Sequence, residues 1–345
     1  MEISSEAMPA QTGAGLPEWS KTIGKYNHAD VRKSVWQIVN TFVPFVALSC
    51  LMYVSLSWSY WLSLLLAPLT AGFLVRIFII QHDCGHNSFF RSRRANTALG
   101  VFCSVLTVTP YHLWRRCHAL HHTTNGNLSH RGIGDILTLT VDEYLELSRW
   151  GRLRYRLYRN PIVMFFFGAS YMFIIRQRFA YGTPHSWRRE RWGVYATNVG
   201  IGLVLLAAWW TIGLGTFFML WLPVAMLGAA AGTWLFFVQH QFEQAYWQPE
   251  HEWDFTRAAL EGSSYYRLPR VLQWFTGNIG FHHIHHLNSR IPNYHLHACY
   301  KAEPAFRDGV TIGLWESLGC AAVKLWDVRQ QRMIGFAEAK AKYAA

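Results

Sequence analysis

The chain has 345 residues, of which 51% are hydrophobic and 16% aromatic, and its 32 Lys and Arg against 20 Asp and Glu give a formal net charge of +12. This apolar content is high for a water-soluble protein and favours a chain that is partly buried in lipid. The positive charge fits basic residues that orient membrane segments, and no motif of a nucleic-acid-binding module is present, so no nucleic-acid partner is expected.

Neither the N-terminal residues nor the cysteines indicate secretion. Residues 1–33 are rich in Ser, Glu, Gly and Pro, lack the segment order of a signal peptide, and are predicted to form a flexible cytoplasmic N-terminus. The cysteines contain no CxxC pair, which favours free thiols on a reducing side of the membrane. They are Cys50, Cys84, Cys103, Cys117, Cys299 and Cys320.

A long window without charge predicts the first membrane hairpin. Residues 34–75 contain no Asp, Glu, Lys or Arg. As a helix they would extend roughly 63 Å, which allows two crossings of a hydrocarbon core about 30 Å thick. We place the helices at about 36–56 and 60–81, with the turn near Ser57–Tyr60. Trp58, Tyr60 and Trp61 suit a membrane interface at that turn.

Two shorter apolar stretches follow, and both are predicted to be re-entrant or interfacial. Thr97–Trp114 and Pro161–Ile175 are shorter than the roughly 20 residues of a typical crossing, and each could either span the membrane or lie in the interface. An odd extra crossing would put the histidine motifs described below on opposite sides, where they could not share a site. The arginine run between the two stretches could be a solvated orientation signal or could contact lipid phosphates or an electron donor. It comprises Arg149, Arg152, Arg154, Arg156 and Arg159.

A second window without charge predicts the second hairpin. The 51 residues from Trp192 to Phe242 contain no Asp, Glu, Lys or Arg, and the small residues of Thr211–Gly215 favour a turn. The helices are expected at about 193–211 and 215–238, with a kink at Pro223. Residues 34–310 would form the membrane domain, and residues 311–345 a cytoplasmic C-terminal helix or tail.

The predicted fold is an all-α integral membrane protein with four transmembrane helices in two hairpins, interfacial or re-entrant helices and a cytoplasmic histidine-rich cap. Neither hairpin turn contains Lys or Arg, whereas the other loops contain all of these residues except Arg76, near the inner end of its helix. Basic loops favour the cytoplasm. We therefore expect a multi-pass protein of the inner or plasma membrane, with its catalytic face and both termini in the cytoplasm.

Three short histidine motifs stand out among 17 histidines. The first is His82-Asp-Cys-Gly-His86, the second His118-Ala-Leu-His121-His122 and the third His282-His-Ile-His285-His286. Separations of three and four residues place side chains on one face of a helix, where two imidazoles can bind one ion or neighbouring ions. With His240 at the inner end of the last apolar helix, the candidate ligands are His82, His86, His118, His121, His122, His240, His282, His285 and His286.

The number of histidines bears on the kind of metal site. A structural zinc site closes with four ligands, and nine histidines exceed that number. Imidazole also suits copper, iron and nickel, so the residues alone leave the metal open. A dinuclear redox centre with open positions for a substrate or O2 is the preferred interpretation, because a hydrolytic dizinc site beside lipid would need a water-filled cleft.

Other polar and aromatic side chains near the motifs are expected to support the ligands or to face solvent or lipid. Asp83, Asp135 and Glu243 are candidates to hydrogen-bond a motif histidine. Trp114 and the Phe-rich segment 162–173 could line an acyl tunnel, although aromatic residues are common at a membrane boundary. The histidines out of phase with the ligand spacing are expected at the surface or in hydrogen bonds, namely His112, His130, His283, His295 and His297.

At these motifs the chain resembles the membrane fatty acid desaturases, and among them the acyl-lipid desaturases of omega-6 (delta-12) type. The matching segments are Gln-His82-Asp-Cys-Gly-His86-Asn-Ser-Phe-Phe, then Pro110-Tyr-His-Leu-Trp114-Arg with His118-Ala-Leu-His121-His122-Thr, and finally Gly280-Phe-His282-His-Ile-His285-His286-Leu with Ile291-Pro-Asn-Tyr. The resemblance extends over roughly residues 35–310.

The resemblance implies two iron ions held by the nine histidines, and an O2-dependent dehydrogenation that leaves a cis double bond in an acyl chain. The third motif begins with His282, whereas front-end desaturases typically have glutamine there. The chain also lacks the His-Pro-Gly-Gly haem-binding sequence of a fused cytochrome b5 domain. An external electron donor of ferredoxin or cytochrome b5 type is therefore expected, attracted by the basic cytoplasmic face. The first motif is spaced differently from that of acyl-CoA desaturases, which favours an acyl chain carried on a membrane glycerolipid.

Two other functions are compatible with the sequence. A related di-iron hydroxylase or oxygenase acting on a lipid or carotenoid would use the same centre and insert oxygen instead. A histidine-rich metal transporter would place its ligands in mid-bilayer on broken helices. Nearly all histidines of this chain lie beyond the apolar windows, which favours an enzyme over a transporter.

Overall fold

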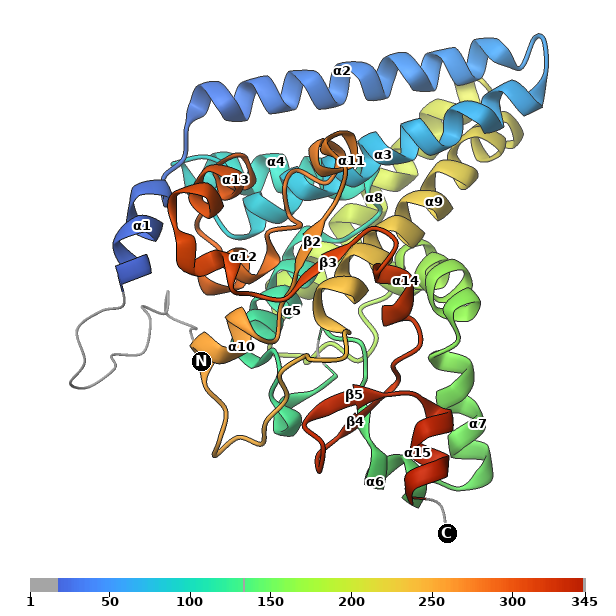
Figure 1. The fold of residues 1–345 in the computed structure, drawn as a ribbon. Coiled ribbons are helices and arrows are strands. Elements are labelled where there is room, and N and C mark those ends of the chain that lie inside the picture. Colours follow the sequence, from blue (N-terminus) through green and yellow to red (C-terminus); the bar gives the residue numbers. More distant parts are fainter. Residues whose placement is uncertain (1–17, 133, 344–345) are drawn as a thin grey trace.

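The computed structural model describes residues 18–132 and 134–343, and its long helices form two hairpins (Figure 1). The first hairpin comprises α2 (Val31–Ser55) and α3 (Tyr60–Gly85), and the second comprises α8 (Arg188–Thr211) and α9 (Leu214–His240). All four helices are long and apolar enough to cross a membrane. The predicted all-α membrane fold with four spanning helices is confirmed.

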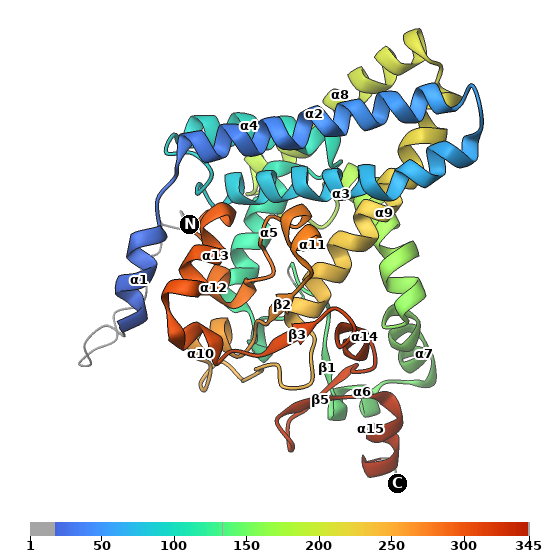
Figure 2. The same cartoon turned by 45° about the horizontal axis from the view of Figure 1, so that its top comes forward.

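Polar caps and a glycine define the starts and turns of the hairpins. The Asp30 carboxylate accepts hydrogen bonds from two backbone N–H groups in the first turn of α2. The Ser59 hydroxyl accepts one from a backbone N–H group of α3. Gly213, between α8 and α9, has a φ of +79°, a conformation that residues with a Cβ rarely adopt. Both turns lie at the same end of the molecule (Figures 1 and 2).

Two helices continue beyond the apolar windows that predict them. The expected ends are near residues 81 and 238, whereas α3 ends at Gly85 and α9 at His240. His82 and His240 therefore lie inside the last turns of these helices, and each is only 4% exposed. Because protein surrounds these turns in place of lipid, a helix need not end where the sequence stops being apolar.

The central helix of the bundle is α3. It is largely buried within the protein, whereas α2, α8 and α9 expose most of their apolar surface, as lipid-facing helices do. Arg76 of α3 is also buried and donates to the Thr41 hydroxyl at 3.1 Å and to the backbone carbonyl of Trp274. Trp274 belongs to α11 (Arg270–Phe275), so this arginine joins the hairpin to a short helix outside it.

The two shorter apolar stretches do not form helices long enough to cross a membrane. The first is divided between α4 (Arg93–Leu106) and α5 (Tyr111–Thr124). The second follows α7 (Arg149–Tyr158) and forms two π-helical segments, Val163–Gly168 and Tyr171–Ile175. Together with neighbouring helical residues, these segments make residues 161–178 one continuous helical run. That neither stretch is an extra crossing stays a prediction.

Short helices and strands form a cap around the histidine-bearing ends of the hairpins (Figures 1 and 2). Its remaining helices are α1 (Glu18–Tyr26), α6 (Val141–Glu146), α10 (Phe255–Leu260), α12 (His282–Leu287), α13 (Asn293–Ala302), α14 (Ser317–Cys320) and α15 (Phe336–Tyr343). Single 3₁₀ turns occur at Leu128–His130, Arg176–Arg178 and Pro304–Arg307. This cap positions the second and third histidine motifs.

Two small sheets join the C-terminal segment to earlier parts of the chain. β3 (Thr311–Gly313) pairs in parallel with β2 (Tyr265–Arg267). β4 (Leu325–Asp327) pairs in parallel with β1 (Leu139–Thr140) and antiparallel with β5 (Arg332–Ile334). Residues 311–343, predicted as a helix or tail, thus contain strands as well as α14 and α15.

The N-terminal segment packs on the cap from α1 onward. Residues 1–17, part of the segment predicted to be flexible, lie outside the described residues. Ile23 of α1 is 5% exposed, and the Thr22 hydroxyl donates to the Glu303 carboxylate at 2.8 Å. Glu303 directly follows α13, so α1 lies beside that helix.

Arg159 differs from the other members of the arginine run because it is buried, with 1% of its surface exposed. Its guanidinium donates to Gln241 Oε1 at 2.8 Å and to the carbonyls of Leu137 and Val323. These acceptors replace water around the charge. The interpretation that the whole run faces solvent, lipid or a partner is therefore wrong for Arg159, which joins three segments of the cap.

Candidate metal centre

Four segments bring the nine predicted histidines together. α3 supplies His82, with His86 directly after its end; α5 carries the second motif, α9 supplies His240 and α12 carries the third motif. The rings form two groups, and within each group one nitrogen of every ring lies within 4.8 Å of those of the others. The five-histidine group comprises His82, His86, His118, His122 and His285, and the four-histidine group comprises His121, His240, His282 and His286.

The spacing of the second and third motifs divides each of them between the two groups. In α5, His118 and His122 belong to the five-histidine group and His121 to the other. In α12 the division is reversed, and only His285 belongs to the five-histidine group. Side chains at neighbouring helix positions point about 100° apart, so two adjacent histidines of one motif belong to different groups. The rings of His122 and His286 stack with centroids 4.1 Å apart, so the two groups adjoin.

In the four-histidine group, ring nitrogens face one another as metal ligands do. His121 donates from Nδ1 to the Asp135 carboxylate at 2.5 Å, and His240 donates from Nδ1 to the Gly262 carbonyl at 3.2 Å. Each neutral ring then presents only a lone pair at Nε2. These two Nε2 atoms are 3.1 Å apart. A cation bound by both would replace the repulsion between the lone pairs with two coordinate bonds.

The five-histidine group contains buried nitrogens that lack a hydrogen-bond partner. His82 donates from Nδ1 to the carboxylate of Asp83 at 3.1 Å. Its Nε2 atom, like that of His86, is buried and has no hydrogen-bond partner among the described residues. Buried polar atoms are nearly always bonded, so these nitrogens fit a set of metal ligands. Both groups consist of imidazoles, which suit iron, copper, zinc or nickel.

Two of the three predicted carboxylates hydrogen-bond these rings, and the third does not. Asp83 contacts His82 through Oδ1, while its Oδ2 accepts the backbone and side-chain N–H groups of Asn293, each at 2.7 Å. Asp135 contacts His121. Glu243 instead pairs with Arg332 at 2.9 Å and is half exposed, so its predicted role at the site is wrong. Asn293, at the start of α13, is a supporting residue that the sequence analysis did not single out.

Burial keeps the rings outside the spanning helices in the neutral form. It holds the pKa of His118 and His285 well below the ordinary value of 6.5, and the charges of neighbouring rings lower it further. The pKa values of His86, His122, His282 and His286 shift in the same direction for the same reason. A neutral imidazole is the form that binds a metal.

Three aromatic side chains lie near the histidines: Phe78 and Trp114 on the side of the five-histidine group, and Phe236 beside the four-histidine group. Phe78, Trp114 and Phe236 precede His82, His118 and His240, each by four residues. Trp114 stacks on His118 with centroids 4.7 Å apart and lies 5.2 Å from Phe78. Phe236 lies 5.0 Å from the rings of both His121 and His240. Of these three, only Trp114 is a sequence-based candidate above, although an aromatic residue one helical turn before each of three histidines is a recognisable signal.

The histidines out of phase with the motifs belong to neither group, as expected. His283 donates from Nε2 to the carbonyl of Phe306 at 3.0 Å. His130 is exposed and lies 3.0 Å from the carboxylate of Glu250. His112 and His297 also lie outside both groups. So does His295, but it is buried and its Nε2 has no hydrogen-bond partner among the described residues, so the expectation of a surface or hydrogen-bonding position is wrong for this residue.

The chain also matches known proteins along most of its length. The family model described as fatty acid desaturase matches residues 57–316, which include all three motifs and His240. A "Fatty acid desaturase" of Bacillus subtilis (strain 168) is 43% identical over 92% of this chain and 90% of the relative. An "sn-1 oleoyl-lipid 12-desaturase" of Anabaena variabilis is 25% identical over 83% and 81%. An "sn-1 acyl-lipid omega-3 desaturase (ferredoxin)" of Nostoc sp. (strain 36) is 27% identical over 64% and 61%. The chain therefore belongs to the fatty acid desaturase family of oxidoreductases.

Proposed function

We propose that this protein introduces a cis double bond into an acyl chain of a membrane glycerolipid, with carbon 12 (the omega-6 position) as the first expected site. The observation that carries the proposal is the pair of adjoining groups in which nine imidazoles direct nitrogens at two centres. Relatives named as acyl-lipid desaturases support the substrate class. The relative at 43% identity carries no bond position in its name, so the position is measured in the experiment below.

The proposed cofactor is a pair of iron ions, one held by the five-histidine group and one by the four-histidine group. When bound, two reduced iron ions supply the activation of O2 that removal of hydrogen from unactivated methylene groups requires. The reaction consumes O2, two electrons and two protons and releases two molecules of water as two neighbouring CH2 groups become a CH=CH unit. The electrons come from an external donor, for which a ferredoxin is proposed, with a cytochrome b5-type protein as the alternative.

The side chains of the protein position the ligands and exclude water. Asp83 and Asp135 accept hydrogen bonds from the Nδ1 atoms of His82 and His121, which directs the Nε2 lone pairs toward the centres. Phe78, Trp114 and Phe236 lie one helical turn from the ligands and provide the apolar surface against which an acyl chain can be held. On α3 and α9, Phe78 and Phe236 lie on the membrane side of their histidines.

The proposed location is the inner or plasma membrane, with the histidine cap in the cytoplasm. The two hairpin turns contain no Lys or Arg, while the segments around the histidines are rich in Arg. An acidic electron donor in the cytoplasm would be attracted to this basic face.

Expression in a bacterial host with saturated and monounsaturated membrane lipids tests the function. We expect new unsaturated chains, with the bond position read by gas chromatography and mass spectrometry of derivatised fatty acids. A double bond at another carbon would contradict the proposed position at carbon 12 but would still support acyl desaturation. A hydroxy acid would instead support oxygen insertion, and unchanged lipids despite bound iron and a competent donor would contradict the proposal.

Two histidine variants test the assignment of the centre. His121→Ala should abolish the product and reduce the iron content, measured by elemental analysis, while the protein stays in the membrane. His130→Gln is the matched control, because His130 is exposed and outside both groups. Full activity of His121→Ala would remove the second motif from the mechanism.

A further inference from the structure

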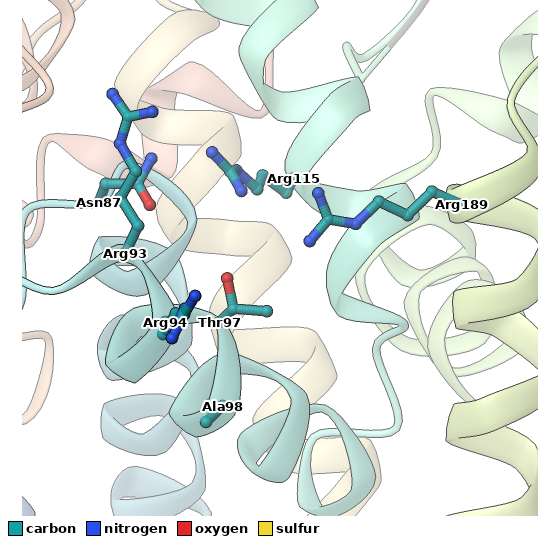
Figure 3. A pocket seen from close by; sticks show the side chains of 7 residues that line it. All are labelled: Asn87, Arg93, Arg94, Thr97, Ala98, Arg115 and Arg189. Atoms are coloured by element: carbon teal, nitrogen blue, oxygen red, sulfur yellow. The ribbon is translucent and has the colours of Figure 1, made fainter.

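A hollow of about 520 Å³ is lined by four arginines. Figure 3 shows these side chains. Arg93, Arg94 and Thr97 come from α4, Arg115 from α5, Arg189 from the start of α8, and Asn87 directly follows His86. The Arg189 side chain points toward Arg115, and the Arg115 guanidinium points on toward the side of the hollow that carries Arg93 and Asn87 (Figure 3). Segments from four parts of the chain thus converge on one positively charged pocket.

The charge of this pocket is uncompensated within the described part of the chain. None of its four arginines makes an ion pair or a side-chain hydrogen bond there. The neighbouring carboxylate of Glu190 pairs with Arg116 at 3.1 Å, and Arg116 in turn stacks on Trp187 at 4.0 Å. Arg93, Arg94 and Arg189 are exposed and Arg115 is half-buried, so an anion can reach all four from solvent or lipid. Several positive charges that line one hollow without a carboxylate favour an anion there, and guanidinium groups match the geometry of phosphate oxygens.

The position of the pocket indicates where this anion comes from. Arg189 is the second residue of α8, a helix apolar enough to cross the membrane. Arg93 and Arg94 begin α4, whose later residues Val101 and Phe102 are exposed and apolar. The arginines thus lie where apolar helical surface begins, which is the depth of lipid phosphate groups.

The pocket also adjoins the proposed reaction site. Arg115 directly follows Trp114, whose ring stacks on His118. Asn87 directly follows His86, another member of the five-histidine group. A lipid whose headgroup occupied the pocket would therefore have its glycerol and acyl chains close to Trp114 and the five-histidine group.

We propose that this arginine pocket binds the phosphate of an anionic glycerophospholipid and so selects the lipid whose acyl chain is desaturated. The inference rests on the proposed function and names its substrate class. Phosphatidylglycerol fits because its headgroup adds no positive charge. Choline and ethanolamine headgroups carry an ammonium that the arginines repel and that no carboxylate of the pocket receives.

Lipid retention tests the pocket independently of catalysis. The full-length protein is purified in detergent with equal amounts of dioleoyl phosphatidylglycerol and dioleoyl phosphatidylcholine, and the retained lipids are quantified by mass spectrometry. We expect about a tenfold preference for phosphatidylglycerol, which Arg115→Gln/Arg189→Gln should largely remove. Arg267→Gln/Arg270→Gln is the matched control, because both arginines are exposed, outside the pocket and without a side-chain partner among the described residues. Equal retention by the unmodified protein, or unchanged preference in the pocket variant, would overturn the proposal.

A competition assay links the pocket to the reaction. Vesicles contain both dioleoyl lipids with different isotope labels, and the products are counted after addition of iron-loaded enzyme, reduced ferredoxin and O2. The pocket variant should lose selectivity between the lipids while still forming product from both. Absence of product from both lipids would count against the proposed function. The retention experiment would still show whether the pocket binds phosphatidylglycerol.

Two further measurements would identify a different occupant of the pocket. If the pocket variant raises the KM for ferredoxin and keeps its lipid selectivity, the arginines bind an acidic protein and the proposal is wrong. If oleoyl-coenzyme A is converted in preference to both lipids and coenzyme A displaces phosphatidylglycerol, the phosphate belongs to a soluble carrier and the lipid assignment is wrong.

Discussion

The carboxylate of Asp135 determines what His121 can do. Its contact with Nδ1 at 2.5 Å assigns the ring proton to that nitrogen and leaves Nε2 as a lone pair facing His240. Asp83 acts in the same way on His82 and also binds Asn293, which ties the first histidine motif to the helix that follows the third. The histidines proposed as ligands are therefore oriented by neighbouring side chains as well as by their own backbone.

Asp135→Asn tests this orientation. The amide keeps the shape of the side chain but removes the charge that favours the Nδ1–H tautomer, so we expect roughly a 10- to 100-fold loss of metal affinity or activity. Iron binding, measured by titration of the metal-free protein, provides a readout separate from turnover. Glu243→Gln is the control, since Glu243 contacts Arg332 and no histidine of either group. Equal effects of the two substitutions would contradict the role assigned to Asp135.

At the scale of helices, the contact between α4 and α5 places the second histidine motif. A Cβ atom on Gly100 of α4 would lie 2.2 Å from the Tyr111 ring at the start of α5. The Tyr111 hydroxyl donates to the carbonyl of Cys84 at 2.8 Å, within the first motif. The close approach of the two helices therefore sets the distance between the first and second motifs.

Gly100→Ala should disturb this contact. The added methyl group forces the Tyr111 ring to move, and overpacking of this kind costs about 1–3 kcal/mol. The midpoint of thermal unfolding in detergent should fall and product formation should decrease. Gly202→Ala in α8 is the control, because nothing lies within 4 Å of its added Cβ, and alanine favours a helix over glycine. A normal unfolding midpoint for Gly100→Ala would contradict the packing argument.

At the scale of the molecule, the two hairpins place their turns at one end and the histidine groups at the other (Figures 1 and 2). In a membrane, the apolar parts of the four helices would cross the hydrocarbon core that lies between these two ends. Acyl chains of a bilayer lie alongside such helices, so a centre at one end of the bundle lies near one surface of the membrane.

Cysteine labelling measures this topology. In a variant with the native cysteines replaced, Ser57→Cys at the first hairpin turn should react with a membrane-impermeant maleimide in intact cells. Glu252→Cys, in an exposed part of the cap, should react only after the membrane is opened. Labelling of both from the same side would contradict the two-hairpin arrangement, and the reverse pattern would place the cap outside.

The spanning helices and the nine histidines were predictable from the sequence for a physical reason. The absence of charge over 42 and 51 residues requires an apolar environment along whole helices, and three- and four-residue spacing places side chains on one face within a single helix. Both signals are local. The orientation of the bundle in the membrane stays a prediction.

Only the tertiary structure decided how the histidines are shared and which charged groups support them. The division of the second and third motifs between two groups depends on how α5 and α12 face α3 and α9, helices far apart in the chain. The same packing brings Asp135 to His121, leaves Glu243 at the surface, buries Arg159 and gathers the four arginines of the pocket. Periodicity within a segment contains no information on such contacts, because they depend on the relative rotation of separate helices.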